Sequence, residues 1–401
     1  MASFDSTRTD EDQVLVEEKR FVRLLTLNRT KQLNALSLTM VSRLLELFVA
    51  YEADPSVKLV VVKGKGRAFC AGGDVSAVVH DIKRGDWKKG AYFFQKEFTF
   101  NYLLATFSKP QVSLLDGIVM GGGAGVSIHG RFRVATEKSV FAMPETALGL
   151  FPDVGASYYL SRLPGFFGEY VGLTGARLDG AEMLACGLAT HFVTSERLTL
   201  LEEALCRADT SEPSIISSII DKFSQRPILK EQSVYHRLHV IDKCFSRRTV
   251  EDILAALEDE ALKKKDDWIT STIQDLKKAS PTSLKISLRS IREGRLQGVG
   301  QCLIREYRMV CHVMRGEVSK DFVEGCRAIL LDKDRNPKVH KISCLLLCLQ
   351  DLLHAIDDTQ ILGLVTDAMV ERYFSRIEDE EWEDLQLPAR ANLPASAISK
   401  L

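Results

Sequence analysis

The sequence of 401 residues has no excess of charge of either sign, because 53 lysines and arginines nearly balance 54 aspartates and glutamates. Nucleic acid and anionic membrane are bound by broad basic surfaces, so the balance argues against both partners. No run reaches the roughly 18 apolar residues that a membrane-spanning helix needs. Residues 1–14 are polar and acidic, and they lack the apolar core of a signal peptide and the arginine-rich pattern of a transit peptide.

The nine cysteines form no CxxC pair and no Cys/His cluster. Zinc sites and disulfide frameworks depend on such spacing, so we expect neither. Reduced and mostly buried thiols, as in an intracellular protein, are the expectation.

Strand and helix patterns alternate in the first half of the chain. Residues 59–62 are a continuous apolar run typical of a strand buried on both faces, and residues 112–115 look like another strand. Ser37 is a plausible N-cap for a helix that begins after it. The alternation predicts an α/β core with parallel strands. From about residue 199 to 331 the pattern is charged and helical, with one long periodic stretch at 250–276.

Two glycine-rich turns follow predicted strands, AFCAGGD at residues 68–74 and MGGGAG at residues 120–125. Glycine lets the backbone approach a ligand closely and point its N–H groups at it. Neither turn is followed by GK[ST] or fits GxGxxG, which weakens nucleotide binding. Plain tight turns are the alternative, but two such turns in one core favour an oxyanion hole for a carbonyl group.

Two carboxylates lie in apolar surroundings shortly after the second turn. Glu145 stands in FAMPET and Asp153 in LFPDVG. Poor solvation raises the pKa of a carboxyl group and suits it for acid–base or nucleophilic chemistry. The alternative is that each carboxylate caps a turn or pairs with an arginine such as Arg131 or Arg162.

Several segments together resemble the crotonase (enoyl-CoA hydratase/isomerase) superfamily and, within it, the 3-hydroxyisobutyryl-CoA hydrolases of plant type. They are LNRTKQLNALS, AFCAGGDVSAV, GIVMGGGAGVSIHGRFRVATE, FAMPETALGLFPDVGASYYLSRLPG and DFVEGCRAILLDKDRNP. The resemblance implies an α/β fold with a crotonase-like (ββα spiral) core and a helical C-terminal region. We divide the chain into an acyl-CoA-binding catalytic core (1–198), a helical region (199–335) and an atypical apolar insert with a tail (336–401).

The resemblance also assigns roles to individual residues. Gly73 and Gly122 match the two oxyanion-hole positions, and Glu145 and Asp153 match the catalytic acid pair of the hydrolases. Glu97 matches a glutamate that contacts the substrate; its sequence pattern alone predicts a solvated helix residue. The expected substrate contacts are therefore Glu97, Gly122, Glu145 and Asp153.

Hydrolysis of the thioester of 3-hydroxyisobutyryl-CoA, and of 3-hydroxypropionyl-CoA beside it, is the activity that the resemblance implies. The enoyl-CoA hydratases of the superfamily carry a second glutamate where this chain has Gly125, so hydration or isomerisation of an enoyl-CoA is the weaker alternative. A non-catalytic scaffold is a second alternative. Coenzyme A is part of the substrate, and we expect no separate cofactor and no metal.

Cys70 and His129 adjoin the two turns and invite catalytic roles. No histidine is placed near Cys70 by the sequence, so we expect it to pack in the core. We expect His129 to be a structural histidine with its hydrogen bonds satisfied.

The C-terminal part departs from the family pattern between residues 339 and 365. This apolar stretch is either a read-through or alternatively spliced segment, or a genuine amphipathic or buried helix. The sequence ends in Ser399, Lys400 and Leu401, the tripeptide recognised by the peroxisomal import receptor. We therefore expect a peroxisomal location and this receptor as a partner, while the oligomeric state is unreadable from the sequence.

Overall fold

Two β-sheets form the centre of the molecule in a computed structural model, which describes residues 13–338, 362–379 and 382–390. The strands of the described residues are β1 (Val14–Lys19), β2 (Val22–Leu27), β3 (Leu59–Gly64), β4 (Ala68–Cys70), β5 (Gln111–Leu115), β6 (Ile118–Met120), β7 (Phe132–Ala135), β8 (Val140–Ala142), β9 (Leu178–Asp179) and β10 (His191–Phe192).

The larger sheet has the order β1-β2-β3-β5-β7-β10, and every neighbouring pair except β1–β2 is parallel. The smaller sheet has the order β4-β6-β8-β9, in which only the β8–β9 pair is antiparallel. The prediction of parallel strands is therefore confirmed for the inner strands of both sheets. The antiparallel partner β1 was not predicted, because its sequence VLVEEK shows no alternation of apolar and polar residues and its last three residues are exposed.

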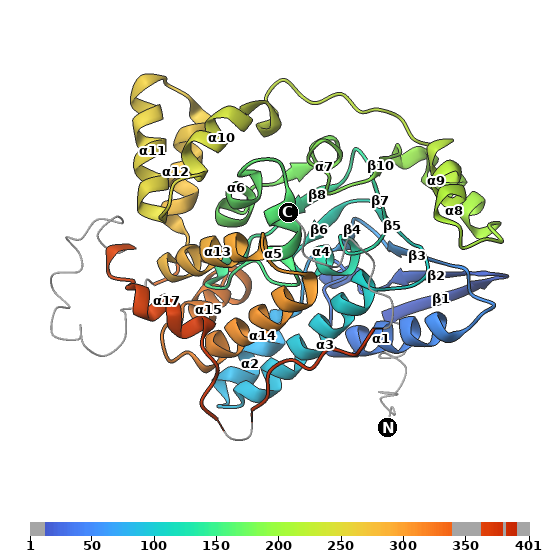
Figure 1. Cartoon of the computed structure of the whole chain (residues 1–401), viewed down its shortest axis with the longest axis horizontal. Coiled ribbons are helices and arrows are strands. Elements are labelled where there is room, and N and C mark those ends of the chain that lie inside the picture. Colours follow the sequence, from blue (N-terminus) through green and yellow to red (C-terminus); the bar gives the residue numbers. More distant parts are fainter. Residues whose placement is uncertain (1–12, 339–361, 380–381, 391–401) are drawn as a thin grey trace, which may run out of the picture.

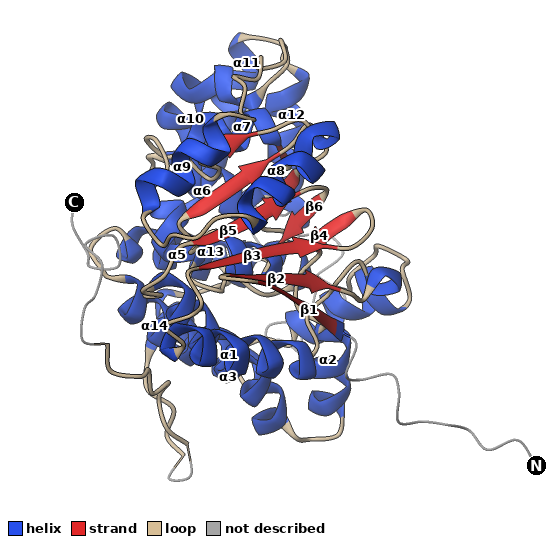
Figure 2. Cartoon of the chain, turned by 90° about the vertical axis from the view of Figure 1, so that its right-hand side faces the viewer, coloured by secondary structure: helices blue, strands red, loops and turns tan. Residues whose placement is uncertain are grey.

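Helices cover both faces of the larger sheet (Figures 1 and 2). The helices of the described residues are α1 (Leu38–Ala53), α2 (Val75–Lys83), α3 (Trp87–Ala105), α4 (Gly122–Ser127), α5 (Ala156–Tyr159), α6 (Phe167–Thr174), α7 (Gly180–Cys186), α8 (Leu198–Cys206), α9 (Pro213–Asp221), α10 (Leu238–Phe245), α11 (Val250–Lys263), α12 (Asp267–Lys278), α13 (Pro281–Gly294), α14 (Val299–Arg315), α15 (Asp321–Cys326) and α17 (Asp367–Phe374). Helices α8 and α9 bury their apolar stripes against one face in a small separate core.

The other face belongs to a large continuous core that includes α1, α3 and the C-terminal helices. Ser37 begins α1 as predicted, because its Oγ accepts a hydrogen bond from the backbone N–H of Met40 at 3.1 Å. Helix α14 packs along α3, and α13 packs on α5 and α6. The helical region and the strand-bearing region therefore share one core, and Figure 1 shows α13 and α14 beside the elements of the first half.

The periodic stretch 250–276 is two helices. Helix α11 ends where Lys264 takes an extended backbone conformation, and Asp266 then caps α12 by accepting a hydrogen bond from the N–H of Trp268 at 3.0 Å. The apolar spacing continues through the break because both helices face the same core, so the period alone did not reveal it.

Two predictions fall mainly on residues outside the described part of the chain. The questioned apolar stretch is described only at 362–365, where Leu362 and Val365 are buried, and the tripeptide Ser399–Lys400–Leu401 is not described. Within the described part, none of the helices combines the length and the apolar character that crossing a bilayer demands.

Candidate active site

Three neighbouring parallel strands of the smaller sheet end at the site. Strand β6 lies between β4 and β8, with Met120 opposite Ala142. The chain leaves β4 into the first glycine turn, β6 into the second, and β8 towards Glu145. Because parallel strands end at the same edge of a sheet, segments far apart in sequence meet here.

The first turn presents one free amide. Leu36 forms an isolated β-bridge with Gly73 of this turn. Its N–H donates to Gly72 O at 2.8 Å, and its carbonyl oxygen accepts from the Asp74 N–H at 2.9 Å. The N–H of Gly73, between these two bonds, has no acceptor among the described residues. Arg29 fixes the far end of the turn through an ion pair with Asp74 at 2.9 Å.

The second turn places another free amide against the first. Gly121 has a φ of +48°, which favours glycine, and it leads into α4, whose first N–H, that of Gly122, has no acceptor among the described residues. A Cβ added to Gly122 would lie 3.0 Å from the nitrogen of Gly73. The two amides thus come from touching turns, as the oxyanion-hole prediction requires.

Two buried carboxylates adjoin these amides. A Cβ on Gly121 would meet Glu145 Oε1 at 2.8 Å, and a Cβ on Gly122 would meet Glu97 Oε1 at 2.5 Å. Only 5 % of Glu145 and 1 % of Glu97 is exposed, so the solvated position that the helix pattern predicted for Glu97 is wrong. Glu97 lies on the face of α3 that turns inward between phenylalanines, where a helical period gives no sign of a polar neighbour.

Asp153 stands in a turn held from two sides. Val154 and Gly155 have φ values of +54° and +79°, and the carbonyl oxygen of Val154 accepts a hydrogen bond from His129 Nε2 at 2.7 Å. On the other side the carboxylate of Glu306 accepts from the N–H of Gly155 at 2.7 Å.

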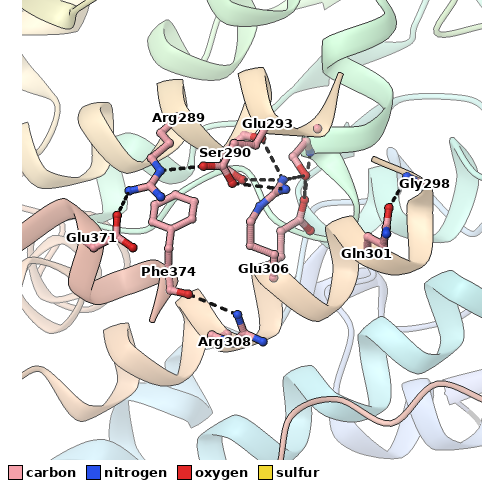
Figure 3. A network of polar contacts seen from close by, with 12 residues as sticks. Arg289, Ser290, Glu293, Gly298, Gln301, Glu306, Arg308, Glu371 and Phe374 are labelled. Atoms are coloured by element: carbon pink, nitrogen blue, oxygen red, sulfur yellow. Dashed lines mark hydrogen bonds and ion pairs between the residues drawn. The ribbon is translucent and has the colours of Figure 1, made fainter. Parts of the chain in front are cut away.

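Glu306 anchors the start of α5 as well as the Asp153 turn. Its Oε1 accepts from the N–H of Ser157 at 3.0 Å and from the Ser157 hydroxyl at 2.5 Å. Arg305 donates to the same hydroxyl oxygen at 2.8 Å and to Ser290 O at 2.9 Å. Figure 3 shows Glu306 on α14 in this network, which extends to Ser290 and Glu293 of α13.

Burial raises the pKa of all three carboxyl groups of the site. For Glu97 and Glu145 desolvation is the main cause, and the charge of Glu97 adds to it at Glu145. The pKa of Asp153 is also raised, by desolvation and then by the charges of Glu97, Glu145 and Glu306. No ion pair of the described residues includes these three groups, so the alternative of pairing with Arg131 or Arg162 is excluded there.

The space beside Gly125 is filled. A Cβ on Gly125 would lie 2.8 Å from Asn101 Nδ2 and 2.8 Å from Val154 Cβ. A glutamate at this position, as in the hydratases, would therefore displace both neighbours.

The two residues that adjoin the turns have structural roles. Cys70 is fully buried, its Sγ contacts Gly72 O at 3.6 Å, and burial raises its pKa to about 12, so the thiolate is disfavoured. Burial lowers the pKa of His129 to about 4, and its Nε2 is bound to Val154 O. Both predictions are confirmed. Among the residues that the structure describes, no three His, Cys, Asp or Glu side chains are grouped to hold a metal ion.

The raised pKa values predict a folded protein that loses stability as pH rises. In the unfolded chain these carboxyl groups release their protons near pH 4. In the folded protein their raised pKa values keep the protons bound to a higher pH. Stability from this cause is full below that range and is lost as pH rises through the raised values, by about 1.4 kcal/mol per pH unit for each extra proton held. Urea unfolding of the wild type and of Glu145→Gln between pH 5 and pH 8 measures it: the variant should have the shallower slope, and parallel curves would contradict the prediction.

Two residues at the site were missed by the sequence analysis. Asn101 lies one helical turn after Glu97, a spacing that could have drawn attention to it. Glu306 lies more than 150 residues from the turn it anchors, and nothing in its local sequence signals this contact.

Several known proteins are similar to this chain. The family model described as enoyl-CoA hydratase/isomerase matches residues 22–344. The 3-hydroxyisobutyryl-CoA hydrolase 1 of Arabidopsis thaliana is 68% identical over 391 residues, which is 98% of each chain. The small ribosomal subunit protein mS47 of the same plant is 47% identical over 96% of this chain and 90% of its own. The crystal structure of a carnitinyl-CoA dehydratase from Mycobacterium thermoresistibile, 34% identical, superposes with a TM-score of 0.81 over 94% of this chain and 100% of that one.

Proposed function

This chain belongs to the enoyl-CoA hydratase/isomerase family, with its crotonase-like α/β fold, and from that membership we propose that it hydrolyses the thioester of 3-hydroxyisobutyryl-CoA to free coenzyme A and the hydroxy acid. The observation that carries the proposal is the pair of unbonded amides of Gly73 and Gly122 beside the buried carboxyl group of Glu145. The high identity to the Arabidopsis hydrolase supports the choice of substrate.

The two amides bind the thioester oxygen. When water or a carboxylate attacks the carbonyl carbon, negative charge develops on that oxygen, and two fixed N–H donors stabilise it without reorganisation. Removing one donor of this kind typically costs about 2.7–4 kcal/mol in the barrier. The donors come from turns whose positions are fixed by β4 and β6, so they are arranged before the substrate arrives.

Glu145 starts the reaction by one of two routes. As a general base it takes a proton from water while the water oxygen bonds to the carbonyl carbon; as a nucleophile it forms a mixed anhydride that water then opens. A raised pKa suits a group that must accept a proton near neutral pH. In both routes the carbon–sulfur bond breaks, and Asp153, whose pKa is raised by burial, gives its proton to the departing thiolate.

Glu97 accepts the hydrogen bond of the substrate's 3-hydroxyl group. This contact favours short 3-hydroxyacyl esters, and 3-hydroxypropionyl-CoA is a second substrate on the same ground. Coenzyme A is consumed as part of the substrate, and the proposed steps use no further cofactor and no metal.

The two alternative functions are hydration or isomerisation of an enoyl-CoA and a non-catalytic scaffold role, and neither releases coenzyme A. Hydration or isomerisation of an enoyl-CoA is disfavoured because Asn101 and Val154 fill the place of the second carboxylate at Gly125. A scaffold role is the alternative raised by the similarity to a ribosomal protein. The retention of Gly73, Gly122 and the buried acids speaks for turnover, since burying unpaired carboxyl groups lowers stability without benefit to a scaffold.

A thiol-release assay with 3-hydroxyisobutyryl-CoA, 3-hydroxypropionyl-CoA and crotonyl-CoA separates the three functions. We expect free coenzyme A from the two 3-hydroxyacyl esters. Loss of enoyl absorbance without thiol release would replace hydrolysis by hydration. No reaction with any ester would favour the scaffold.

A role in valine catabolism in the peroxisome completes the proposal. The substrate supports the pathway, and the support for the location is the tripeptide Ser399–Lys400–Leu401 with its import receptor. That segment lies outside the described residues, so import and the receptor stay predictions.

A further inference from the structure

Asn101 is a buried amide with no hydrogen-bond partner. It lies in the middle of α3 with an exposed fraction of 0 %, and neither its Oδ1 nor its Nδ2 meets a donor or acceptor among the described residues. Leaving such a group unpaired typically costs about 1–3 kcal/mol, so native proteins rarely keep one without a use.

The unpaired amide lies one helical turn from one of the unpaired acids. Within the described part of the chain, Glu97 Oε1 and Glu145 Oε2 are likewise buried atoms of the site without a hydrogen-bond partner. Glu97 lies one turn before Asn101 on α3, and the two side chains face successive turns of α4: Glu97 faces Gly122 and Asn101 faces Gly125. Val154, the residue after Asp153, comes equally close to Gly125, because a Cβ added there would lie 2.8 Å from the Val154 Cβ.

We propose that Asn101 binds the 3-hydroxyl group of the acyl chain and so determines the preference for 3-hydroxyacyl thioesters. The proposal deepens the proposed hydrolase function and rests on it. With the thioester oxygen at the Gly73 and Gly122 amides, the hydroxyl oxygen lies three bonds beyond the carbonyl carbon. Asn101 follows Glu97, the proposed acceptor of that hydroxyl group, by one turn of α3.

The chemistry of the two side chains is complementary to a hydroxyl group. A hydroxyl offers one donor and two acceptor sites. The carboxyl group of Glu97 accepts a hydrogen bond from the hydroxyl group, and Nδ2 of Asn101 donates one to the hydroxyl oxygen. Because its amide is neutral, Asn101 adds no negative charge to a site that already holds three carboxyl groups.

A substrate without the hydroxyl would leave both side chains unpaired. Sites built to bind a substrate hydroxyl reject the analogue that lacks it by large factors, because their own buried polar groups then go unsatisfied. The wild type should therefore hydrolyse 3-hydroxyisobutyryl-CoA with a kcat/KM at least about a hundredfold above that for isobutyryl-CoA.

Asn101→Leu tests the inference, because leucine has the same branching at Cγ and no polar atom. We expect the ratio of the two kcat/KM values to fall by about tenfold or more, chiefly through slower turnover of the hydroxylated ester. We also expect an unchanged or higher melting temperature, since the substitution removes an unpaired buried amide. A structural role would give the opposite pattern, a lower melting temperature with an unchanged ratio, and would overturn the inference.

Thr99→Val is the matched control on the same helix, because the Thr99 hydroxyl bonds only to Gln95 O one turn away. It should leave the ratio unchanged. If Asn101→Leu does not fold, the wild type alone decides: equal kcat/KM values for the hydroxylated and the plain ester would overturn the inference. Absence of thiol release from every ester would remove the proposed function itself, whereas hydrolysis without discrimination removes only the role of Asn101.

Discussion

Glutamine at position 145 should lower thioester hydrolysis by about a thousandfold or more and leave the protein folded. The amide keeps the shape of the side chain beside Gly121 but can neither take a proton from water nor attack the carbonyl carbon. Because Glu145 has an oxygen without a partner and a raised pKa, the folded state gains little from its charge. The melting temperature at neutral pH should therefore stay the same or rise while kcat falls.

The matched control for this experiment is Glu169→Gln. Glu169 is also buried, but it is on α6 and is paired with Arg295 at 2.8 Å. We expect this variant to melt at a lower temperature, since it leaves a partly buried arginine without its partner, and to keep its kcat. Near-wild-type turnover of Glu145→Gln would contradict the assignment of Glu145, and calorimetry beside the thiol-release assay measures both properties.

The parts of the site that follow strands were accessible from the sequence. Gly73, Gly122 and Glu145 stand two or three residues after β4, β6 and β8, and a glycine cluster or an acid in an apolar stretch is visible at such places. The prediction that Glu145 and Asp153 are poorly solvated is confirmed, because the apolar neighbours in sequence are also neighbours in space.

The parts of the site supplied by helices were not accessible in this way. A glutamate in a long helix usually faces water, and it is the packing of α3 against α4 and its other neighbours that makes Glu97 and Asn101 interior residues. The pairing of the short strands into a second sheet is equally hidden, because alternation predicts parallel strands but not which strands are neighbours. Resemblance to a family supplied Glu97, and neither pattern nor resemblance supplied Glu306.

Replacing Glu306 by alanine should both destabilise the protein and slow the reaction. The N–H groups of Gly155 and Ser157 and the Ser157 hydroxyl would lose their common acceptor in the interior, and we expect a loss of about 3 kcal/mol in the free energy of unfolding. Without this anchor the Asp153 turn, which already contains Val154 at a positive φ, would lose its fixed position. Misplacing a reacting group by about 1 Å can cost a hundredfold in rate, so kcat should fall by about that factor.

A conservative variant separates the role in positioning from the role in folding. Glu306→Gln keeps one acceptor oxygen and the packing, so it should recover much of the stability. The charge of Glu306 helps to raise the pKa of Asp153, and its removal lowers that pKa. Since Asp153 acts in its protonated form, the decline of kcat at high pH should begin at a lower pH in the variant. Glu371→Gln is the control, because its carboxylate pairs with Arg289 at 2.7 Å near the surface in the same network (Figure 3). An alanine variant that is less stable but has wild-type kcat and an unshifted pH profile would show that Glu306 serves the fold alone.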